Sequence, residues 1–327
     1  MKAKLWKVVF IVISAGFFVI PWLVPWTRDY APGIAVITGI ACSVLWGNPF
    51  AALTGKYTST LLGVAIVGMG CGMNLIDVLR AGANGFIYTL IGIAVGIGLG
   101  VWLGKRLGLG RDLMYLISVG TSICGGSAIA AAAPVLKAKA HDVAIASATV
   151  FTLNAVALLI FPAVGHALNF SEPQFGYWAA LAIHDTSSVV GACFQYGPVA
   201  MEVGTTVKLA RALWIVPVTL FLSCCVAGAA DDGKRKIQFK IPWFIPCFIA
   251  AAALVTWLPA VAPAGQFLKE VSKYLMIMTL FLIGANLSRA KLRELGLKPI
   301  LHGVILWLVL ATMWCTAIAL KWVHCAQ

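Results

Sequence analysis

Two polar segments interrupt an otherwise apolar sequence and hold residue types that could bind a small ion. The first contains Thr121, Ser122, Cys124, Gly125, Gly126 and Ser127, and the second contains His184, Asp185, Thr186, Ser187 and Ser188. Hydroxyl groups and helix-terminal N–H groups attract anions, and glycine lets the backbone approach a ligand closely. Asp185 could bind a cation or exchange a proton, and His184 could titrate near physiological pH. Two structural alternatives stay open, in which Gly and Ser only permit tight helix packing and His184 and Asp185 only cap a hairpin.

The two polar segments are related to each other. Placing Ile123 on Ile183 superimposes Ser127 on Ser187. Small and hydroxylated residues at membrane depth indicate broken backbone, which is tolerated only inside protein or along a cavity. Broken helices in a repeated arrangement are typical of secondary-transporter binding sites.

Other polar residues could contribute to such a site. Lys208 and Arg211 lie three residues apart, on one face of an expected span. They could neutralise Asp185 and Glu202, or they could attract an anionic substrate directly. Asn74 and Asn286 occupy the same place in two Gly-x-Asn-Leu sequences and are predicted to be equivalent helix-break positions. Asp77 and Asn154 are weaker candidates.

The composition is that of a membrane protein embedded in a lipid bilayer. Hydrophobic residues make up 61% of the chain and charged residues only 11%, too few to cover a soluble protein of this length. The net charge of +13 comes from Lys and Arg in short loops beside the spans, which predicts topology and argues against nucleic-acid binding. The nine cysteines form no Cys-x-x-Cys pair, so we expect neither a metal site nor a cofactor.

The expected fold is an all-α polytopic membrane protein with about nine transmembrane helices. The expected spans are 5–25, 31–48, 58–77, 86–104, 143–168, 203–227, 241–259, 270–288 and 300–321. The polar segments, 113–135 and 177–197, are predicted to be re-entrant hairpins or broken crossing helices. The positive-inside rule places the N-terminus in the cytoplasm and the C-terminus in the periplasm.

The chain is expected to consist of a first span and two related repeats. Residues 1–30 form the first span, residues 31–168 form one repeat with the hairpin 113–135, and residues 177–321 form the other with the hairpin 177–197. In the expected topology, paired elements have opposite orientations and their order is circularly permuted. Inverted repeats of this kind underlie many alternating-access transporters.

The combined motifs resemble the YeiH family of proposed sulfate exporters. They are Ser122-Ile123-Cys124-Gly125, the His184 segment, Val207-Lys208-Leu209-Ala210-Arg211 and Gly296-Leu297-Lys298-Pro299. The resemblance covers nearly the whole chain and implies a bacterial inner-membrane transporter of an inorganic anion or small sulfonate. The chain departs from the family pattern at 184–188, where many members have His-Glu-Val-Ala-Gln.

The sequence therefore favours a secondary transporter for a small anion, coupled to H+ or Na+ and working by alternating access. An anion channel would use a similar polar lining and is the alternative. An intramembrane enzyme using His184 and a serine lacks a supporting base or metal cluster and is not expected. The sequence is compatible with a homo-oligomer.

Overall fold

The described part of the protein is helical and falls into two compact units. The computed structural model describes residues 2–24, 27, 31–215, 217–218, 220–222, 243–286 and 296–323, and within these ranges it contains no β-strand. Unit 1 comprises Met1–Val78 and Pro242–Lys291, and unit 2 comprises Leu79–Ile241 and Leu292–Gln327. Each unit draws on both of the predicted repeats, so the compact units do not coincide with the repeats.

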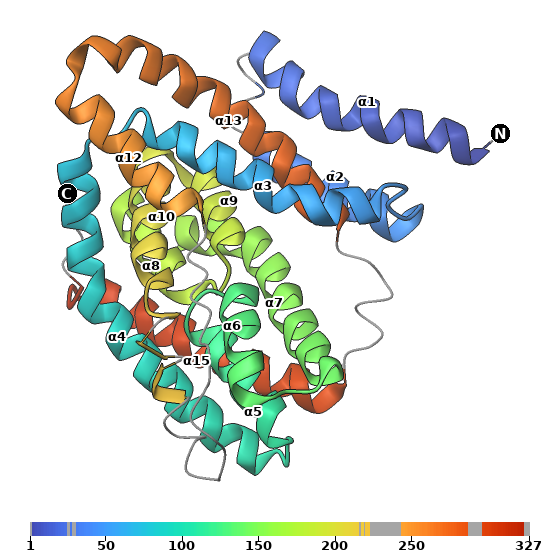
Figure 1. Ribbon diagram of the computed structural model, residues 1–327, viewed down its shortest axis with the longest axis vertical. Helices are drawn as coiled ribbons and strands as arrows, with labels where there is room; N and C mark the ends of the chain where they lie inside the picture. Colours follow the sequence, from blue (N-terminus) through green and yellow to red (C-terminus); the bar gives the residue numbers. More distant parts are fainter. Residues whose placement is uncertain are drawn as a thin grey trace. The chain divides into compact units, whose positions relative to one another are not determined.

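Unit 1 is built around one long helix, α13. Its elements are α1 (Lys2–Leu23), α2 (Ala31–Leu45), α3 (Ala51–Gly70), α12 (Phe244–Trp257), the short 3-10 helix η2 (Pro259–Val261) and α13 (Ala262–Ala285). Helices α1, α2 and α3 all pack on α13, which is orange in Figure 1. A Cβ atom at Gly39 of α2 would overlap the carbonyl oxygen of Phe281, and one at Gly284 would overlap that of Val36. Small residues thus bring α2 and α13 into backbone contact, as is common between helices in membranes.

Unit 2 contains both polar segments. Its helices are α4 (Leu75–Arg106), which begins in unit 1, α5 (Arg111–Ser122), α6 (Gly126–Leu136), α7 (Ala140–Ala167), α8 (Glu172–Ala182), α9 (Thr186–Tyr196), α10 (Pro198–Ala212) and α15 (Leu297–Ala319). Helix α7 contacts α5, α6 and α9, while α10 packs against α8 and α9. Helix α15 contacts α5, α7 and α8, so both polar segments pack among helices of their own unit.

A stripe of glycines on α4 positions α5. Gly96, Gly100 and Gly104 recur every fourth residue and therefore lie on one face of the helix. A Cβ atom at Gly96 or Gly100 would collide with the hydroxyl of Ser122 or Ser118 on α5. The stripe allows α5 to lie against α4 at close range, which fixes the end of α5 where the first polar segment breaks.

Each polar segment folds back on itself as a helical hairpin. The rings of Phe175, near the start of α8, and Tyr196, at the end of α9, stack with centroids 3.8 Å apart. In the first segment, a Cβ atom at Gly120 would lie 2.8 Å from the Ile129 side chain. In a continuous helix these two positions would be about 13 Å apart along the axis. The hairpin form of the prediction therefore fits both segments better than a broken crossing helix.

The helix lengths differ from several of the predicted spans. Among the described residues, four helices are long and apolar enough to cross a membrane, or five if the bent pair α12 and α13 counts as one span. That pair is bent by 107° at Leu258–Pro259, where proline cannot continue the preceding helix. The predicted span 58–77 is wrong in its bounds, because α3 ends at Gly70 and α4 already begins at Leu75. Part of the predicted span 203–227 lies outside the described residues.

Candidate functional site

The two hairpins break at equivalent positions, and the breaks touch each other. Helix α5 ends at Ser122 and α6 begins at Gly126, while α8 ends at Ala182 and α9 begins at Thr186. The second interruption lies sixty residues after the first, which is the offset of the sequence repeat. A Cβ atom at Gly125 would lie 3.4 Å from the Cβ atom of Asp185, so the two tips are in direct contact.

Lys208 is completely buried at the junction of the hairpins. Its Nζ donates to the carbonyl oxygens of Ile183 (2.6 Å), Ile123 (3.2 Å) and Ala180 (3.4 Å). A lysine ammonium has three hydrogens to donate, and here three backbone acceptors surround it. Lys208 points inward because the interrupted helices leave carbonyls that need donors.

Arg211 fastens the same two helix ends, one turn further along α10. Its Nε and Nη2 donate to the carbonyl oxygen of Ser122 (3.1 and 2.5 Å), and its Nη1 donates to those of Leu181 (2.6 Å) and Ala180 (3.1 Å). The last carbonyls of a helix have no partner within the helix and carry the negative end of its dipole. The two cations therefore satisfy and neutralise the C-terminal ends of α5 and α8.

This arrangement adds a role that was not predicted for the two cations. We expected Lys208 and Arg211 either to pair with Asp185 and Glu202 or to contact an anion directly. The structure commits their hydrogen bonds to backbone carbonyls of the two breaks. The physical reason is that a broken helix inside a protein exposes several carbonyls at once, and these need hydrogen-bond donors.

The Asp185 carboxylate caps helix α9. One of its oxygens accepts hydrogen bonds from the backbone N–H groups of Ser187 (3.0 Å) and Ser188 (3.3 Å), and also from the Ser187 hydroxyl. Thr186, Ser187 and Ser188 form the first turn of this helix. Asp185 is half-buried and already supplies a negative charge at the N-terminus of α9, where such a charge is favourable. Asp185 is therefore the N-cap of α9.

The N-terminus of α6, in contrast, has no side-chain cap. Its N-cap residue is Gly125, which has no side chain to cap the helix, and the Cys124 sulfur interacts with the backbone N–H of Ala128 in the first turn. Gly126 is half-buried and Ser127 is exposed, while the neighbouring Thr121, Ser122 and Cys124 are buried. Cys124 is close enough to Lys208, Arg211 and Asp185 to interact with their charges. The α6 terminus thus offers open N–H groups beside a cluster of charged residues.

Several buried polar atoms around the breaks lack hydrogen-bond partners among the residues that the structure describes. They include both ring nitrogens of His184, the amide nitrogen of Asn154 and the hydroxyl of Thr121. The amide oxygen of Asn154, on α7, accepts from the backbone N–H groups of His184 (3.1 Å) and Asp185 (3.3 Å). Buried polar groups are rarely left unpaired, so these atoms are donors and acceptors that a bound ligand or water could satisfy.

Asn154 was underrated by sequence reasoning, which ranked it among the weaker candidates. The structure makes it the residue of α7 that holds the second break. The signal that could have found it was an amide in the middle of the apolar stretch 143–168.

The two predicted helix-break asparagines lie in unit 1, whereas the other candidates lie in unit 2. Asn286 follows α13 and is hydrogen-bonded to Thr54 (2.6 Å), Thr58 (3.1 Å) and Asn48 (3.1 Å). Asn74 accepts a hydrogen bond from the N–H of Ile76 (2.8 Å) at the start of α4. Both asparagines therefore make hydrogen bonds at helix ends.

Within the described ranges, no group of three or more His, Cys, Asp or Glu residues is placed to hold a metal ion.

The conformation of Gly125 leads to a first mutational prediction. Its φ of 67° and ψ of −127° fall in a region that is open essentially to glycine alone. We expect Gly125→Ala to lower the free energy of unfolding by about 1–3 kcal/mol, because the new Cβ forces a strained backbone or a displaced tip. The measurement is thermal unfolding of the purified protein, with Gly98→Ala on α4 as the control because a Cβ there meets no other atom. Equal melting of both variants would contradict the assigned role of Gly125.

Comparison with known proteins places the chain in a family. A family model described as "Conserved hypothetical protein 698" matches residues 10–303. A UPF0324 membrane protein of Bdellovibrio bacteriovorus is 50% identical over 89% of this chain and 89% of its own length. Relatives of the same name from Geobacter sulfurreducens and Bacteroides thetaiotaomicron are 45% and 42% identical, over 88% and 89% of this chain and 91% and 87% of their own lengths. No solved structure matches. The chain therefore belongs to the UPF0324, or YeiH, family of membrane proteins.

Proposed function

We propose that this membrane protein is a secondary transporter of a small anion and works by alternating access. The observation that carries the proposal is the contact between two equivalent helix breaks, whose C-terminal ends are bound by Lys208 and Arg211. Because these cations cover the carbonyl ends of α5 and α8, the N-terminal ends of α6 and α9 are left as the positive poles of the breaks. Discontinuous helices that meet in this way are a recurrent construction of transporter binding sites.

An anion is the cargo that the local charge favours. Lys208 and Arg211 contribute two positive charges and Asp185 contributes one negative charge, so these three residues leave an excess of one positive charge. The uncapped start of α6 adds N–H donors, and Asn154 and His184 add donors that have no partner in the described structure. An inorganic sulfur oxyanion or a sulfonate would accept several such hydrogen bonds through its oxygen atoms.

Asp185 is the residue that we assign to ion coupling. Binding of H+ or Na+ to its carboxylate would weaken the cap on α9 and raise the positive charge at the tips, which would favour entry of the anion. The predicted inverted repeats, 31–168 and 177–321, would supply two states that expose the tips to opposite sides of the membrane. In this account the protein lies in the bacterial inner membrane with its N-terminus in the cytoplasm.

Asn154 provides the mutational test of the anion site. Asn154→Asp keeps an oxygen acceptor for the N–H groups of His184 and Asp185, but it removes the unpartnered amide donors and adds a negative charge. We expect this variant to fold and to bind its anion at least ~10-fold more weakly, since each lost charge-assisted contact costs about 1.5–3 kcal/mol. Thermal-shift titration with sulfate, sulfite and sulfonates, in parallel with halides and carboxylates, measures the affinity.

Two further variants complete this test. Asn169→Asp adds the same charge at an exposed loop position and should bind like the parent. Asn154→Leu leaves two backbone N–H groups without their acceptor and should unfold more easily than Asn154→Asp. If Asn154→Asp and Asn169→Asp bind a stabilising anion equally well, the site does not include Asn154.

A further inference from the structure

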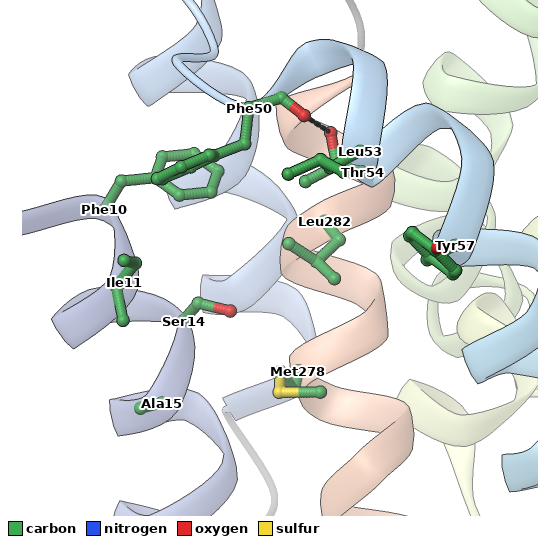
Figure 2. Close-up of a pocket in the computed structure, with 10 residues that line it drawn as sticks. All are labelled: Phe10, Ile11, Ser14, Ala15, Phe50, Leu53, Thr54, Tyr57, Met278 and Leu282. Atoms are coloured by element: carbon green, nitrogen blue, oxygen red, sulfur yellow. Dashed lines mark hydrogen bonds between the residues drawn. The ribbon is translucent and has the colours of Figure 1, made fainter. Parts of the chain in front are cut away.

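Unit 1 contains an apolar groove whose lining residues belong to α1, α3, α13 and the residue before α3, and none of them belongs to the polar hairpins. It has a volume of about 400 Å³, within the ~300–1,000 Å³ range of pockets that hold small ligands. Figure 2 shows its construction, with Phe10, Ile11, Ser14 and Ala15 of α1 on one side and Leu53 and Tyr57 of α3 on the other. Met278 and Leu282 of α13 form the floor between them.

The lining of the groove suits a hydrocarbon ligand. Apart from Ser14, Thr54 and the phenol of Tyr57, its side chains are carbon and sulfur only. The Thr54 hydroxyl is already hydrogen-bonded to Asn286 at 2.6 Å. Ile11 and Leu53 are each 55% exposed, so the groove opens on the outside of the helices. Such a surface would bind an acyl chain mainly through contacts with apolar side chains.

Positive charge flanks the groove. The Nζ atom of Lys7 lies 6.0 Å from the ring centroid of Phe50, and that of Lys56 lies 5.2 Å from the ring centroid of Tyr57. Both rings line the groove, and helices α1 and α3 contain no Asp or Glu. The charge beside this groove is therefore positive on both walls, which is complementary to an anionic head group.

Aromatic residues mark the level at which a head group would lie. The indole of Trp6 donates to the carbonyl of Gly47 (3.0 Å) and contacts Trp46, with ring centroids 5.4 Å apart. Trp residues concentrate at the membrane interface. From Trp6 to Ala15, α1 rises about 13 Å, close to the ~15 Å hydrocarbon depth of one leaflet. With Trp6 at the interface and α1 crossing the bilayer, the groove would lie in the acyl region of one leaflet, on the side where the positive-inside rule predicts the cytoplasm.

We propose that this groove is a binding site for an anionic phospholipid of the cytoplasmic leaflet. One acyl chain lies between α1 and α3 on the surface of α13, and the phosphate group lies at Lys7 and Lys56. The site fastens α1 to α3 and α13 through the lipid. It is independent of the proposed transport function, since none of its residues belongs to the hairpins.

The test is native mass spectrometry of the purified full chain titrated with phosphatidylglycerol or with phosphatidylcholine of the same acyl chains. We expect phosphatidylglycerol to bind more tightly. Lys7→Gln and Lys56→Gln should each weaken it about fivefold, as expected for one basic residue near an anionic surface. Ala15→Phe, which fills the groove, should abolish binding of both lipids.

Two variants are the matched controls. Lys105→Gln changes an exposed lysine of unit 2, and Ile20→Phe changes an exposed position of α1 outside the lining.

Three results would overturn the proposal. Equal affinity for the two lipids would remove the role of Lys7 and Lys56. Unchanged lipid binding by Ala15→Phe would show that the acyl chain lies elsewhere. A dimeric parent that Ala15→Phe converts to a monomer, with no lipid released, would identify the groove as a contact between two copies of the chain. Melting of each variant without added lipid shows whether a loss of binding reflects unfolding.

Discussion

Replacing Arg211 by Met should destabilise the protein by about 3–5 kcal/mol, the cost of leaving buried partners of a removed charge unsatisfied. The guanidinium makes four hydrogen bonds to the carbonyls of Ser122, Ala180 and Leu181, and Met can make none of them. Because Met fills a similar volume, the loss would be due to polar contacts more than to a cavity. Thermal unfolding should show a melting temperature lower by roughly 10 °C.

Two companion variants show whether this loss depends on the hairpin ends. Arg211→Lys retains the charge but not the planar fork of donors, so its melting temperature should lie between those of the parent and Arg211→Met. Arg106→Met removes an exposed arginine whose guanidinium lies 5.5 Å from the Trp102 ring centroid, and should cost less than ~1 kcal/mol. Melting of Arg211→Met at the temperature of Arg106→Met would refute the proposed role of the buried cation.

Replacing Asp185 by Asn should remove the negative charge of this side chain while keeping its hydrogen bonds to the start of α9. Asn is as good an N-cap as Asp, so the hydrogen bonds to Ser187 and Ser188 can persist and the melting temperature should change little. If Asp185 carries the coupling ion, the effect of pH or Na+ on anion affinity should disappear, a loss of coupling of ~5–150-fold. Anion titrations at several pH values, with and without Na+, measure this effect.

Glu172→Gln is the matched control for Asp185→Asn. The Glu172 carboxylate accepts from the N–H of Val199 (2.7 Å) at the start of α10, so it is also a capping carboxylate. This variant should retain any dependence of anion binding on pH or Na+. Persistence of that dependence in Asp185→Asn would exclude Asp185 as the coupling residue.

A double-mutant cycle between Arg211→Gln and Asp185→Asn tests the arrangement of charges. The hydrogen bonds of Arg211 go to carbonyls of α5 and α8, and those of Asp185 go to N–H groups of α9. The two substitutions should therefore have stability effects that add within ~0.5 kcal/mol. If the two residues were instead a structural ion pair, the double variant would be substantially rescued.

The sequence predicted the places where the helices break but not what fastens them. Glycine and hydroxyl residues at 120–127 and 183–188 indicated interrupted backbone, and the sixty-residue offset related the two interruptions. The acceptors of Lys208 and Arg211 are backbone carbonyls, which carry no signature in a sequence. Only the three-dimensional contact of two interrupted helices shows that seven hydrogen bonds from two cationic side chains reach five carbonyls.

Helix bounds and long-range contacts were harder to predict than the polar segments. The span 58–77 was misplaced because its apolar run continues across the break between α3 and α4, and Asn74 caps the second of these helices. The glycine stripe of α4 was not recognised, because glycines in an apolar run are compatible with any packing partner. The groove between α1 and α3 depends on residues more than two hundred positions apart, such as Phe10 and Met278.

Counterflow in proteoliposomes tests the central claim most directly. Vesicles containing the purified protein are preloaded with an unlabelled anion that stabilises it, and uptake of the labelled anion is followed at increasing external concentration. We predict saturable uptake that the internal anion accelerates, and that is lost in Arg211→Met but retained in Arg106→Met. Uptake that rises without saturation, is unaffected by the internal anion and is accompanied by single-channel currents would contradict alternating access and identify an anion channel.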